Sequence, residues 1–212
     1  MQKIIGICGL KGSGKDTIAK IICENDPSFI TVAFADCVKD IASIMFGWPR
    51  EMLSGRTVES REWREQPDVY WSEAFGFEFT PRRALTTLGT DIIHDTFLKH
   101  IWDLNVKKKI LSDHEHNFVI IDVRFPNEIE MIKGIGGNIV QVERGERPEY
   151  WKAAEKQNKG QVLLPFETES LLNIHPSESA WIGVNDPEHI FYNNGTIEDL
   201  TKEVIEYFGL KK

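Results

Sequence analysis

The sequence has few cysteines, no long apolar run and no excess of positive charge. Its 212 residues include three cysteines, Cys8, Cys23 and Cys37. Their number is odd and their spacing is not that of metal ligands, so we expect reduced thiols rather than disulfides or a zinc site. No apolar stretch approaches membrane-spanning length, and the glycine-broken amino-terminal segment does not resemble a signal peptide. These absences predict a soluble, cytoplasmic protein without a membrane partner.

The charge balance also excludes some classes of partner. The chain has 25 Lys and Arg against 33 Asp and Glu, giving a formal net charge of −8. Proteins that bind nucleic-acid backbones usually carry an excess of basic residues on one face, so broad binding to DNA is not expected. Hydrophobic residues make up 41% of the chain, which is enough to form a packed core. The length fits one α/β domain over residues 1–212 with an insertion.

Short apolar runs alternate with amphipathic segments along most of the chain. The apolar runs predict strands at residues 1–8, 29–34, 118–122, 138–142 and 189–192. The helical spacing of apolar residues predicts helices at 16–24, 81–109, 126–133 and 196–208, and another that Asp36 caps. Buried strands joined by helices indicate a mostly parallel sheet covered on both faces. Residues 47–80 lack this periodicity and should form short helices and loops, whereas 144–179 is polar and irregular, a candidate lid.

A glycine-rich loop, GLKGSGK, joins the first predicted strand to the first predicted helix at Gly9–Lys15. In such loops, glycines let main-chain N–H groups surround a phosphate, and the helix N-terminus and the lysine add favourable charge. The alternative is an ordinary tight turn between strand and helix. We favour a triphosphate-binding loop that consists of Leu10, Lys11, Gly12, Ser13, Gly14, Lys15, Asp16 and Thr17.

Asp16 stands where such loops usually place the Ser or Thr that binds magnesium. Its carboxylate could ligate Mg²⁺ directly, act through water, or orient an acceptor oxygen, while Thr17 could donate to the α-phosphate. Asp16 could instead simply favour the helix N-terminus as an anion. We favour a role linked to Mg²⁺, because an unneutralised carboxylate would repel a bound triphosphate.

A second acidic residue, Asp122, closes the predicted strand at 118–122, and Arg124 follows two residues later. Side chains at the carboxyl ends of parallel strands line the ligand crevice, so Asp122 is a second candidate Mg²⁺ ligand. The guanidinium of Arg124 could bridge two phosphates as a phosphoryl group moves between them. The alternative has Asp122 capping the next turn and Arg124 pairing with Glu128.

Three motifs together resemble the phage-type deoxynucleoside monophosphate kinases. They are the loop at residues 9–17, the RRALTTLGTDII block at residues 82–93, and DVRFPNE at residues 122–128. The similarity extends over nearly the whole chain. Phosphomevalonate kinases of the animal type share the first and third motifs, so the block at residues 82–93 is the more specific match.

This resemblance implies a three-layer P-loop kinase fold with a five-stranded parallel sheet in the order 2-3-1-4-5. It also implies an acceptor-binding insertion at about residues 47–103 and a lid at about 144–179. The implied reaction moves the γ-phosphoryl group of ATP, with Mg²⁺, onto a deoxynucleoside monophosphate in the cytoplasm of a phage-infected bacterium. The implied acceptor-side residues are Lys11, Arg82 or Arg83, Arg124 and Arg144.

The insertion and the last turn hold weaker candidates. Arg56 is the arginine of the insertion that we favour for the acceptor, ahead of Arg61 and Arg64, although the glutamates interleaved there could pair with all three. The aromatic residues of the insertion could stack on a base or simply pack together; they are Trp63, Tyr70, Trp71 and Phe75. Asn193 and Asn194 follow the last strand, where adenine commonly rests in this fold class, although asparagine also suits left-handed turns.

Some alternatives remain open from the sequence. His175, Ser177 and Glu178 suggest a hydrolytic constellation, but no nucleophile elbow accompanies them, so we favour a lid contact or a helix cap. The acceptor could be hydroxymethyluracil in phage DNA or phosphomevalonate, and DNA as an acceptor fits the acidic chain poorly. A protein of another class, an ATP-binding switch that transfers nothing, is the remaining rival. The sequence leaves open whether the chain forms a homodimer.

Overall fold

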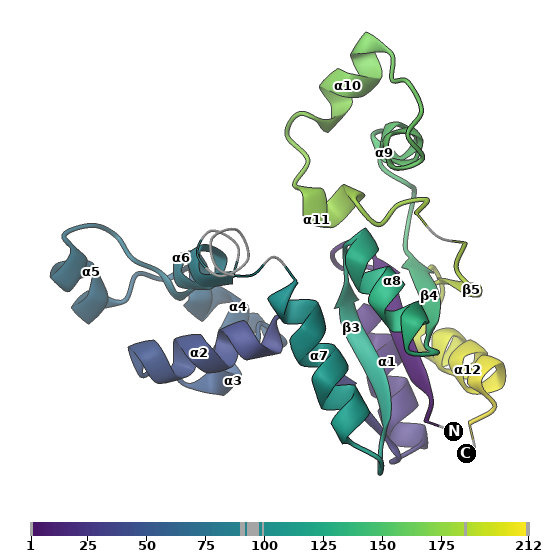
Figure 1. The fold of residues 1–212 in the computed structure, drawn as a ribbon, viewed down its shortest axis with the longest axis horizontal. Coiled ribbons are helices and arrows are strands. Elements are labelled where there is room, and N and C mark those ends of the chain that lie inside the picture. Colours follow the sequence, from purple (N-terminus) through teal and green to yellow (C-terminus); the bar gives the residue numbers. More distant parts are fainter. Residues whose placement is uncertain (1, 90–91, 93–97, 99, 185, 211–212) are drawn as a thin grey trace. The chain divides into compact units, whose positions relative to one another are not determined.

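The computed structural model describes residues 2–89, 92, 98, 100–184 and 186–210. The chain divides into two compact units, which are described separately (Figure 1). Unit 1 consists of Met1–Ala33 and Val106–Lys212, and unit 2 of Phe34–Asn105. Unit 2 therefore contains the whole segment for which an acceptor-binding role is predicted. Among the described residues, no helix combines the length and the apolar character needed to cross a membrane.

Unit 1 is built on a five-stranded parallel sheet. Its strands are β1 (Ile4–Gly9), β2 (Phe29–Val32), β3 (Asn117–Val123), β4 (Asn138–Glu143) and β5 (His189–Tyr192). They lie in the order β2-β3-β1-β4-β5, which confirms the predicted order. β1 is central and pairs with β3 and β4, both in parallel. The carboxyl ends of β1 and β3, where the predicted site residues stand, are therefore neighbours.

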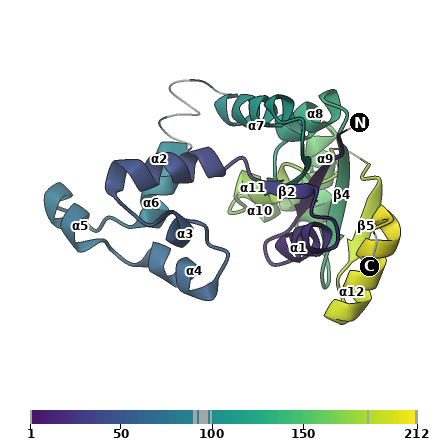
Figure 2. The ribbon, with the colours of Figure 1, turned by 90° about the horizontal axis from the view of Figure 1, so that it is seen from below.

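Helices cover both faces of this sheet, as predicted. The helices of unit 1 are α1 (Lys15–Asn25), α8 (Pro126–Gly134), α9 (Trp151–Asn158), α10 (Pro165–Leu171), α11 (Pro176–Ser179), α12 (Ile197–Phe208) and the later part of α7 (Ile101–Ser112). α1 and α12 lie on one face, whereas α8 and α7 lie on the other (Figures 1 and 2). Ile18 and Ile22 of α1 are fully buried against Ile7 and Phe191 of the sheet. This apolar core holds both ends of the glycine-rich loop.

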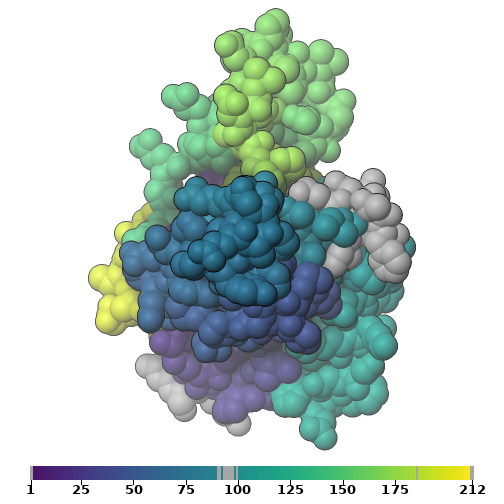
Figure 3. All heavy atoms as spheres, turned by 90° about the vertical axis from the view of Figure 1, so that its left-hand side faces the viewer, coloured from purple at the N-terminus to yellow at the C-terminus, as the bar shows by residue number. Residues whose placement is uncertain are grey.

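Unit 2 is a small helical body around aromatic side chains. Its helices are α2 (Asp36–Phe46), α3 (Arg50–Leu53), α4 (Val58–Glu65), α5 (Val69–Phe75) and α6 (Pro81–Thr86), as the aperiodic sequence predicts for 47–80. The Phe46 ring stacks on Trp48 with centroids 4.5 Å apart, and Trp48 Nε1 donates to Asp68 Oδ2 at 2.8 Å. Val69 and Tyr70 of α5 are exposed to solvent. Figure 3 shows the surface of this part of unit 2 in blue.

Three expectations about secondary structure need correction. The helix expected over residues 81–109 is not continuous in the described part of that range, since α6 ends at Thr86, residues 87–89 are π-helical, Leu98 is not helical and α7 begins at Ile101; Thr90, Asp91 and Ile93 of the RRALTTLGTDII block lie outside the described residues. Asp36 does not cap α2 but is its first residue, and it accepts from Arg50 Nη2 at 2.9 Å. The segment 144–179 is not irregular.

That segment holds α9, α10 and α11, two of which begin with a proline at the first helical position. Buried Trp151 meets Trp181 edge to face at 5.4 Å, which gives this segment a small apolar core of its own. The helices are short and centre on only a few large side chains, so apolar periodicity does not reveal them.

Candidate active site

The glycine-rich loop has a backbone that favours glycine at three of its positions. Gly9 has a φ of 151°, Gly12 a φ of 79° and Gly14 a φ of 112°. A Cβ at Gly9 would lie 2.5 Å from the Val142 carbonyl oxygen, and one at Gly14 would lie 2.4 Å from Asn193 Nδ2. The strands β4 and β5 therefore shape the loop from the side. As predicted, the loop follows β1 and opens α1, so main-chain N–H groups gather at a helix N-terminus.

Lys15 folds back over this loop. Its Nζ donates to the Gly9 carbonyl at 2.8 Å and to the Leu10 carbonyl at 2.9 Å. Burial lowers the pKa of Lys15 below its ordinary value, and the charge of Arg124 lowers that pKa further, while Glu178 and Asp16 oppose the shift. Two cations whose charges act on each other favour an anion that binds near both of them.

The residue pair after β5 fixes the loop and its surroundings. Asn193 Nδ2 donates to the Ser13 carbonyl at 2.8 Å, and Asn194 Oδ1 accepts from the Gly145 N–H at 2.7 Å. Neither asparagine has a positive φ, so the idea that they serve a left-handed turn is wrong. The prediction that Asn194 contacts a nucleotide stays a prediction. Asn193 is a loop-positioning residue, whereas the sequence suggested a place near adenine or a role in a turn.

The two predicted carboxylates lie at the same edge of the sheet. Asp16 is exposed in the first turn of α1, and Thr17 beside it is half-buried. Asp122 is half-buried one residue before the end of β3, the strand that pairs with β1. The position of Asp122 beside the loop strand is as predicted, and the roles of Asp16 and Asp122 toward a metal remain predictions.

A single carboxylate joins Arg124 to the loop. Glu178 Oε1 accepts from Arg124 Nη1 at 2.9 Å, and Glu178 Oε2 accepts from the Lys11 N–H at 3.2 Å. The side chain of Lys11 itself is exposed. Glu178 thus binds the kind of groups, a loop amide and a guanidinium, that would bind a phosphate. The loop and Arg124 were predicted to act together, whereas the role of Glu178 between them was missed.

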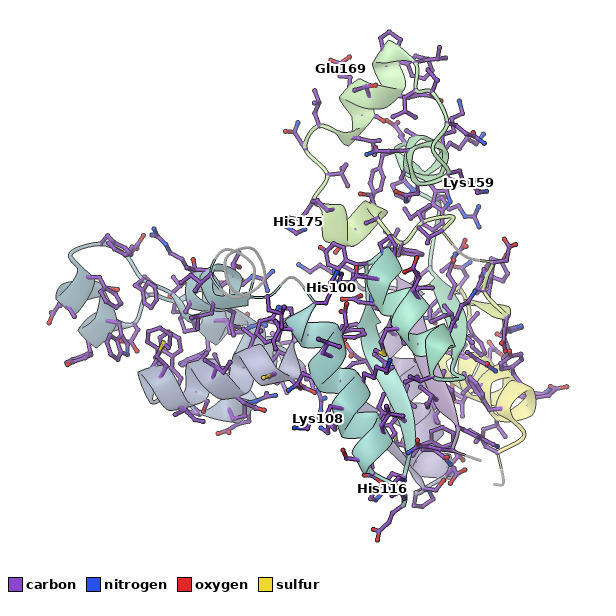
Figure 4. All side chains as sticks on the ribbon, in the orientation of Figure 1. His100, Lys108, His116, Lys159, Glu169 and His175 are labelled. Carbon is purple, nitrogen blue, oxygen red and sulfur yellow. The ribbon has the colours of Figure 1, made fainter. Side chains whose placement is uncertain are left out.

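The segment that carries Glu178 is capped as the sequence suggested. His175 precedes α11 (Figure 4), and its Nδ1 accepts from the Ser177 N–H at 3.2 Å. The expectation of a helix cap at His175 is therefore confirmed. This cap orients the short helix that places Glu178 against the loop.

Glu128 holds the turn that carries Arg124. Its buried Oε2 accepts from the Arg124 N–H at 2.6 Å and from the Phe125 N–H at 2.9 Å. The alternative that Arg124 pairs with Glu128 is thus correct for the main chain of Arg124, whereas its guanidinium turns to Glu178. A carboxylate three residues into a helix satisfies N–H groups that the helix itself leaves unpaired.

Replacing Glu128 with alanine should therefore destabilise unit 1. We expect Glu128→Ala to lower the free energy of unfolding by about 2–3 kcal/mol, because two N–H groups lose their acceptor. Urea denaturation followed by circular dichroism measures this loss. Glu130→Ala, in an exposed position of the same helix, is the matched control and should change stability by less than about 0.5 kcal/mol. Equal stability of the two variants would contradict the role given to Glu128.

Arg144 lies at a pocket beside the loop. The pocket is lined by Leu10, Val142, Glu143, Arg144, Gly145, Glu146, Arg147 and Trp151. Arg147 is bound within it, because its Nε donates to Glu143 Oε2 at 3.0 Å and its guanidinium stacks 4.7 Å from the Trp151 ring centroid. Arg144 is exposed. The structure thus brings Arg144 and Leu10 to one pocket, and the ligand contacts of Arg144 stay a prediction.

The predicted acceptor-side arginines of unit 2 differ from one another. Arg83 packs over the Phe77 ring at 4.4 Å and donates to the Glu78 carbonyl at 3.3 Å. Arg82 is exposed, with its Nε 4.0 Å from Glu65 Oε1. Arg56 is exposed in the turn before α4. Of the two adjacent arginines, Arg83 is thus bound by a ring and a carbonyl of unit 2, whereas Arg82 has only a long contact with Glu65.

The aromatic residues of the insertion mainly pack against one another. Trp63 meets Trp48 edge to face at 6.1 Å, and Trp71 stacks on Phe75 at 5.6 Å. Trp71 Nε1 also donates to a main-chain carbonyl, that of Phe46, at 3.1 Å. Trp63 and Trp71 therefore pack within unit 2, which is the alternative to stacking on a base.

Comparisons with known proteins give the chain its relatives. The family model described as deoxynucleotide monophosphate kinase matches residues 56–158. A protein of Acanthamoeba polyphaga mimivirus, provisionally named deoxynucleotide monophosphate kinase, is 28% identical over 95% of this chain and 94% of its own length. The deoxynucleoside-5′-monophosphate kinase of Escherichia phage T5 is 27% identical over 63% of this chain and 72% of its own length.

Solved structures are similar at a lower level. TT1252 from Thermus thermophilus aligns with 98% of this chain and 97% of its own, at 16% identity and a TM-score of 0.46. The family model and the sequence relatives confirm the resemblance that the loop, the RRALTTLGTDII block and the DVRFPNE motif predict: the chain is similar to proteins named as deoxynucleotide monophosphate kinases.

Proposed function

We propose that the protein is a phosphotransferase that converts deoxynucleoside monophosphates to diphosphates with ATP. One observation carries the proposal: Lys15 folds over the loop, and the carboxylate of Glu178 joins a main-chain N–H of the same loop to Arg124. Cations and oriented N–H groups at a helix N-terminus are the arrangement that polyphosphates require. The names of the sequence relatives supply the class of acceptor.

The donor phosphates would bind in the loop Gly9–Lys15, surrounded by its main-chain N–H groups. Lys15 would exchange the carbonyls of Gly9 and Leu10 for phosphate oxygens, which accept more strongly because they are charged. Thr17, in the same first turn, would donate to the α-phosphate. Positioning and charge compensation supply most of the catalysis in phosphoryl transfer.

The site also suits magnesium. Mg²⁺ prefers one or two carboxylates together with phosphate oxygens and water, and Asp16 and Asp122 offer two carboxylates at the same edge of the sheet. The described residues contain no group of three or more acidic, His or Cys side chains that could hold a metal alone. A bound Mg²⁺ would neutralise charge on the β- and γ-phosphates.

In the proposed reaction, a phosphate oxygen of the acceptor attacks the γ-phosphorus of ATP, and ADP leaves. Arg124 would stabilise the charge that develops on the transferred group, with Lys11 at the same loop. Arg56, Arg82 and Arg83 are the proposed acceptor contacts within unit 2. The segment 144–179, with Arg144, would act as a lid that excludes water and so limits hydrolysis of ATP.

The assay that tests this function measures ATP consumption with each of the four deoxynucleoside monophosphates and without any acceptor. We expect consumption to depend on at least one monophosphate and mass spectrometry to find the corresponding diphosphate. Parallel reactions contain phosphomevalonate and duplex DNA with hydroxymethyluracil. Transfer to either of these alone, or hydrolysis of ATP that needs no acceptor, would overturn the proposal.

Glu178 should compete with the donor for its binding groups. In the free protein its carboxylate occupies the Lys11 amide and the Arg124 guanidinium, so ATP must displace it. We expect Glu178→Gln to lower the KM for ATP about three- to tenfold, because a neutral amide binds a guanidinium less strongly. Steady-state kinetics at a saturating acceptor concentration measure this change.

Glu169→Gln provides the control for that measurement. Glu169 is an exposed carboxylate on α10 of the same segment (Figure 4), and its substitution should leave the KM for ATP unchanged. A higher KM for ATP in Glu178→Gln would show the opposite role, in which Glu178 holds Arg124 ready for the donor.

A further inference from the structure

Arg64, in the last turn of α4, has no partner for its charge among the described residues. Its Nε is buried and makes no hydrogen bond. No carboxylate of the described part of unit 2 lies within 4.0 Å of its guanidinium, whereas Arg50 of the same unit is bound to both Asp36 and Asp40. The side chain as a whole is half-buried, but a buried donor atom is nearly always hydrogen-bonded, so the unpaired Nε is an exception that a bound ligand would explain.

The guanidinium of Arg64 lies against the backbone of Gly55. A Cβ at Gly55 would lie 2.1 Å from Arg64 Nη2 and 2.4 Å from its Cζ. Gly55 also has a φ of 68°, which L side chains rarely adopt. The glycine therefore leaves the space that the guanidinium fills.

The charges of two other arginines, Arg61 and Arg82, act on Arg64. Burial lowers the pKa of Arg64 first, and the charges of Arg82 and Arg61 lower it further, while Glu65 opposes part of the shift. An arginine does not lose its proton at neutral pH. The repulsion between Arg64 and Arg82 must therefore be tolerated in the free protein, and a bound anion would relieve it.

We propose that Arg64, together with Arg82, forms a binding site for a phosphate monoester in unit 2. The fork of Nη1 and Nη2 matches two phosphate oxygens, and two guanidinium groups match a dianion in charge. Arg82 is free to turn toward the ligand, since its contact with Glu65 is long and both side chains are more than half exposed. The inference rests on the proposed function for one point, that the monoester is the 5′-phosphate of the acceptor.

Arg64→Ala tests this site, with Arg61→Ala as the matched control because Arg61 is an exposed arginine on the same helix. Calorimetric titration with the accepted monophosphate should show a Kd raised about 30-fold or more in Arg64→Ala and less than twofold in Arg61→Ala. The KM for ATP should stay unchanged in both. Arg64→Lys should recover only part of the affinity, because lysine cannot bind two oxygens with a planar fork.

Thermal unfolding without ligand separates binding from structure. Removal of an uncompensated cation should leave the Tm of Arg64→Ala equal to or above that of the wild type. A structural role would instead lower the Tm in parallel with the affinity, and that result, or an unchanged Kd, overturns the inference. The increase in Tm that the monophosphate causes in the wild type should be absent from Arg64→Ala.

The test also distinguishes this inference from the proposed function. If the wild type binds monophosphates through Arg64 but transfers no phosphoryl group to them, the anion site stands and the proposed function fails. If transfer proceeds and Arg64→Ala keeps the wild-type KM for the acceptor, the function stands and the inference fails.

Discussion

Replacing Lys15 with alanine is expected to lower kcat/KM for phosphoryl transfer about 1,000-fold or more. Lys15 is the half-buried cation of the loop, and its Nζ already lies at the two carbonyls that end β1 and begin the loop. Alanine would leave the main-chain N–H groups in place but remove the charge that meets the β- and γ-phosphates. A coupled assay for ADP release, with the best acceptor of the panel, measures the loss.

The control for this experiment is Lys20→Ala in the same helix. Lys20 is exposed and forms an ion pair with Glu24 at 3.6 Å, so its removal should leave activity within about twofold of the wild type. Circular dichroism and thermal unfolding establish that both variants fold. A folded Lys15→Ala protein with full transferase activity would refute the proposed function of the loop.

Replacing Arg124 with alanine is expected to lower kcat about 100- to 1,000-fold. The positive charge of the guanidinium lowers the pKa of Lys15. The two cations would therefore act on the same bound phosphates. Loss of Arg124 removes charge compensation during transfer. Arg124→Lys should recover little of it, because lysine lacks the planar fork. Single-turnover measurements separate this effect on the chemical step from product release.

A double-mutant cycle with Glu178 tests whether the two side chains act together. If Glu178 competes with ATP partly through Arg124, the decrease in the KM for ATP caused by Glu178→Gln should be smaller in the Arg124→Ala background. If the KM for ATP decreases equally in both backgrounds, Glu178 competes with ATP only through the Lys11 amide. An unchanged kcat in Arg124→Ala would show that Arg124 only anchors the lid-like segment.

The order of the sheet and the position of the loop could be predicted because they depend on local pattern. Apolar runs mark β1, β3 and β4, and Gly9 and Gly14 are required by the backbone itself. The partners of the loop could not be predicted in this way. Glu178 reaches the Lys11 amide across 167 positions of sequence, and no local pattern records such a contact.

The arginines illustrate the same limit within unit 2. In the sequence, Arg56, Arg64, Arg82 and Arg83 are alike, since each stands in a polar stretch near glutamates. Their roles separate only when tertiary packing shows which guanidinium is buried beside Gly55 and which stacks on Phe77. Burial and pairing, rather than residue type, decide which of these charges remains available for a ligand.

The bond from Asn193 to Ser13 has a consequence for synthesis of the protein on the ribosome. Ser13 is translated 180 residues before Asn193, a delay of roughly ten seconds or more at typical translation rates. Until then, the nascent loop lacks the amide that holds one of its carbonyls in place. Capture of nucleotide by a newly made chain should therefore appear only late, once β5 has left the exit tunnel and paired with β4.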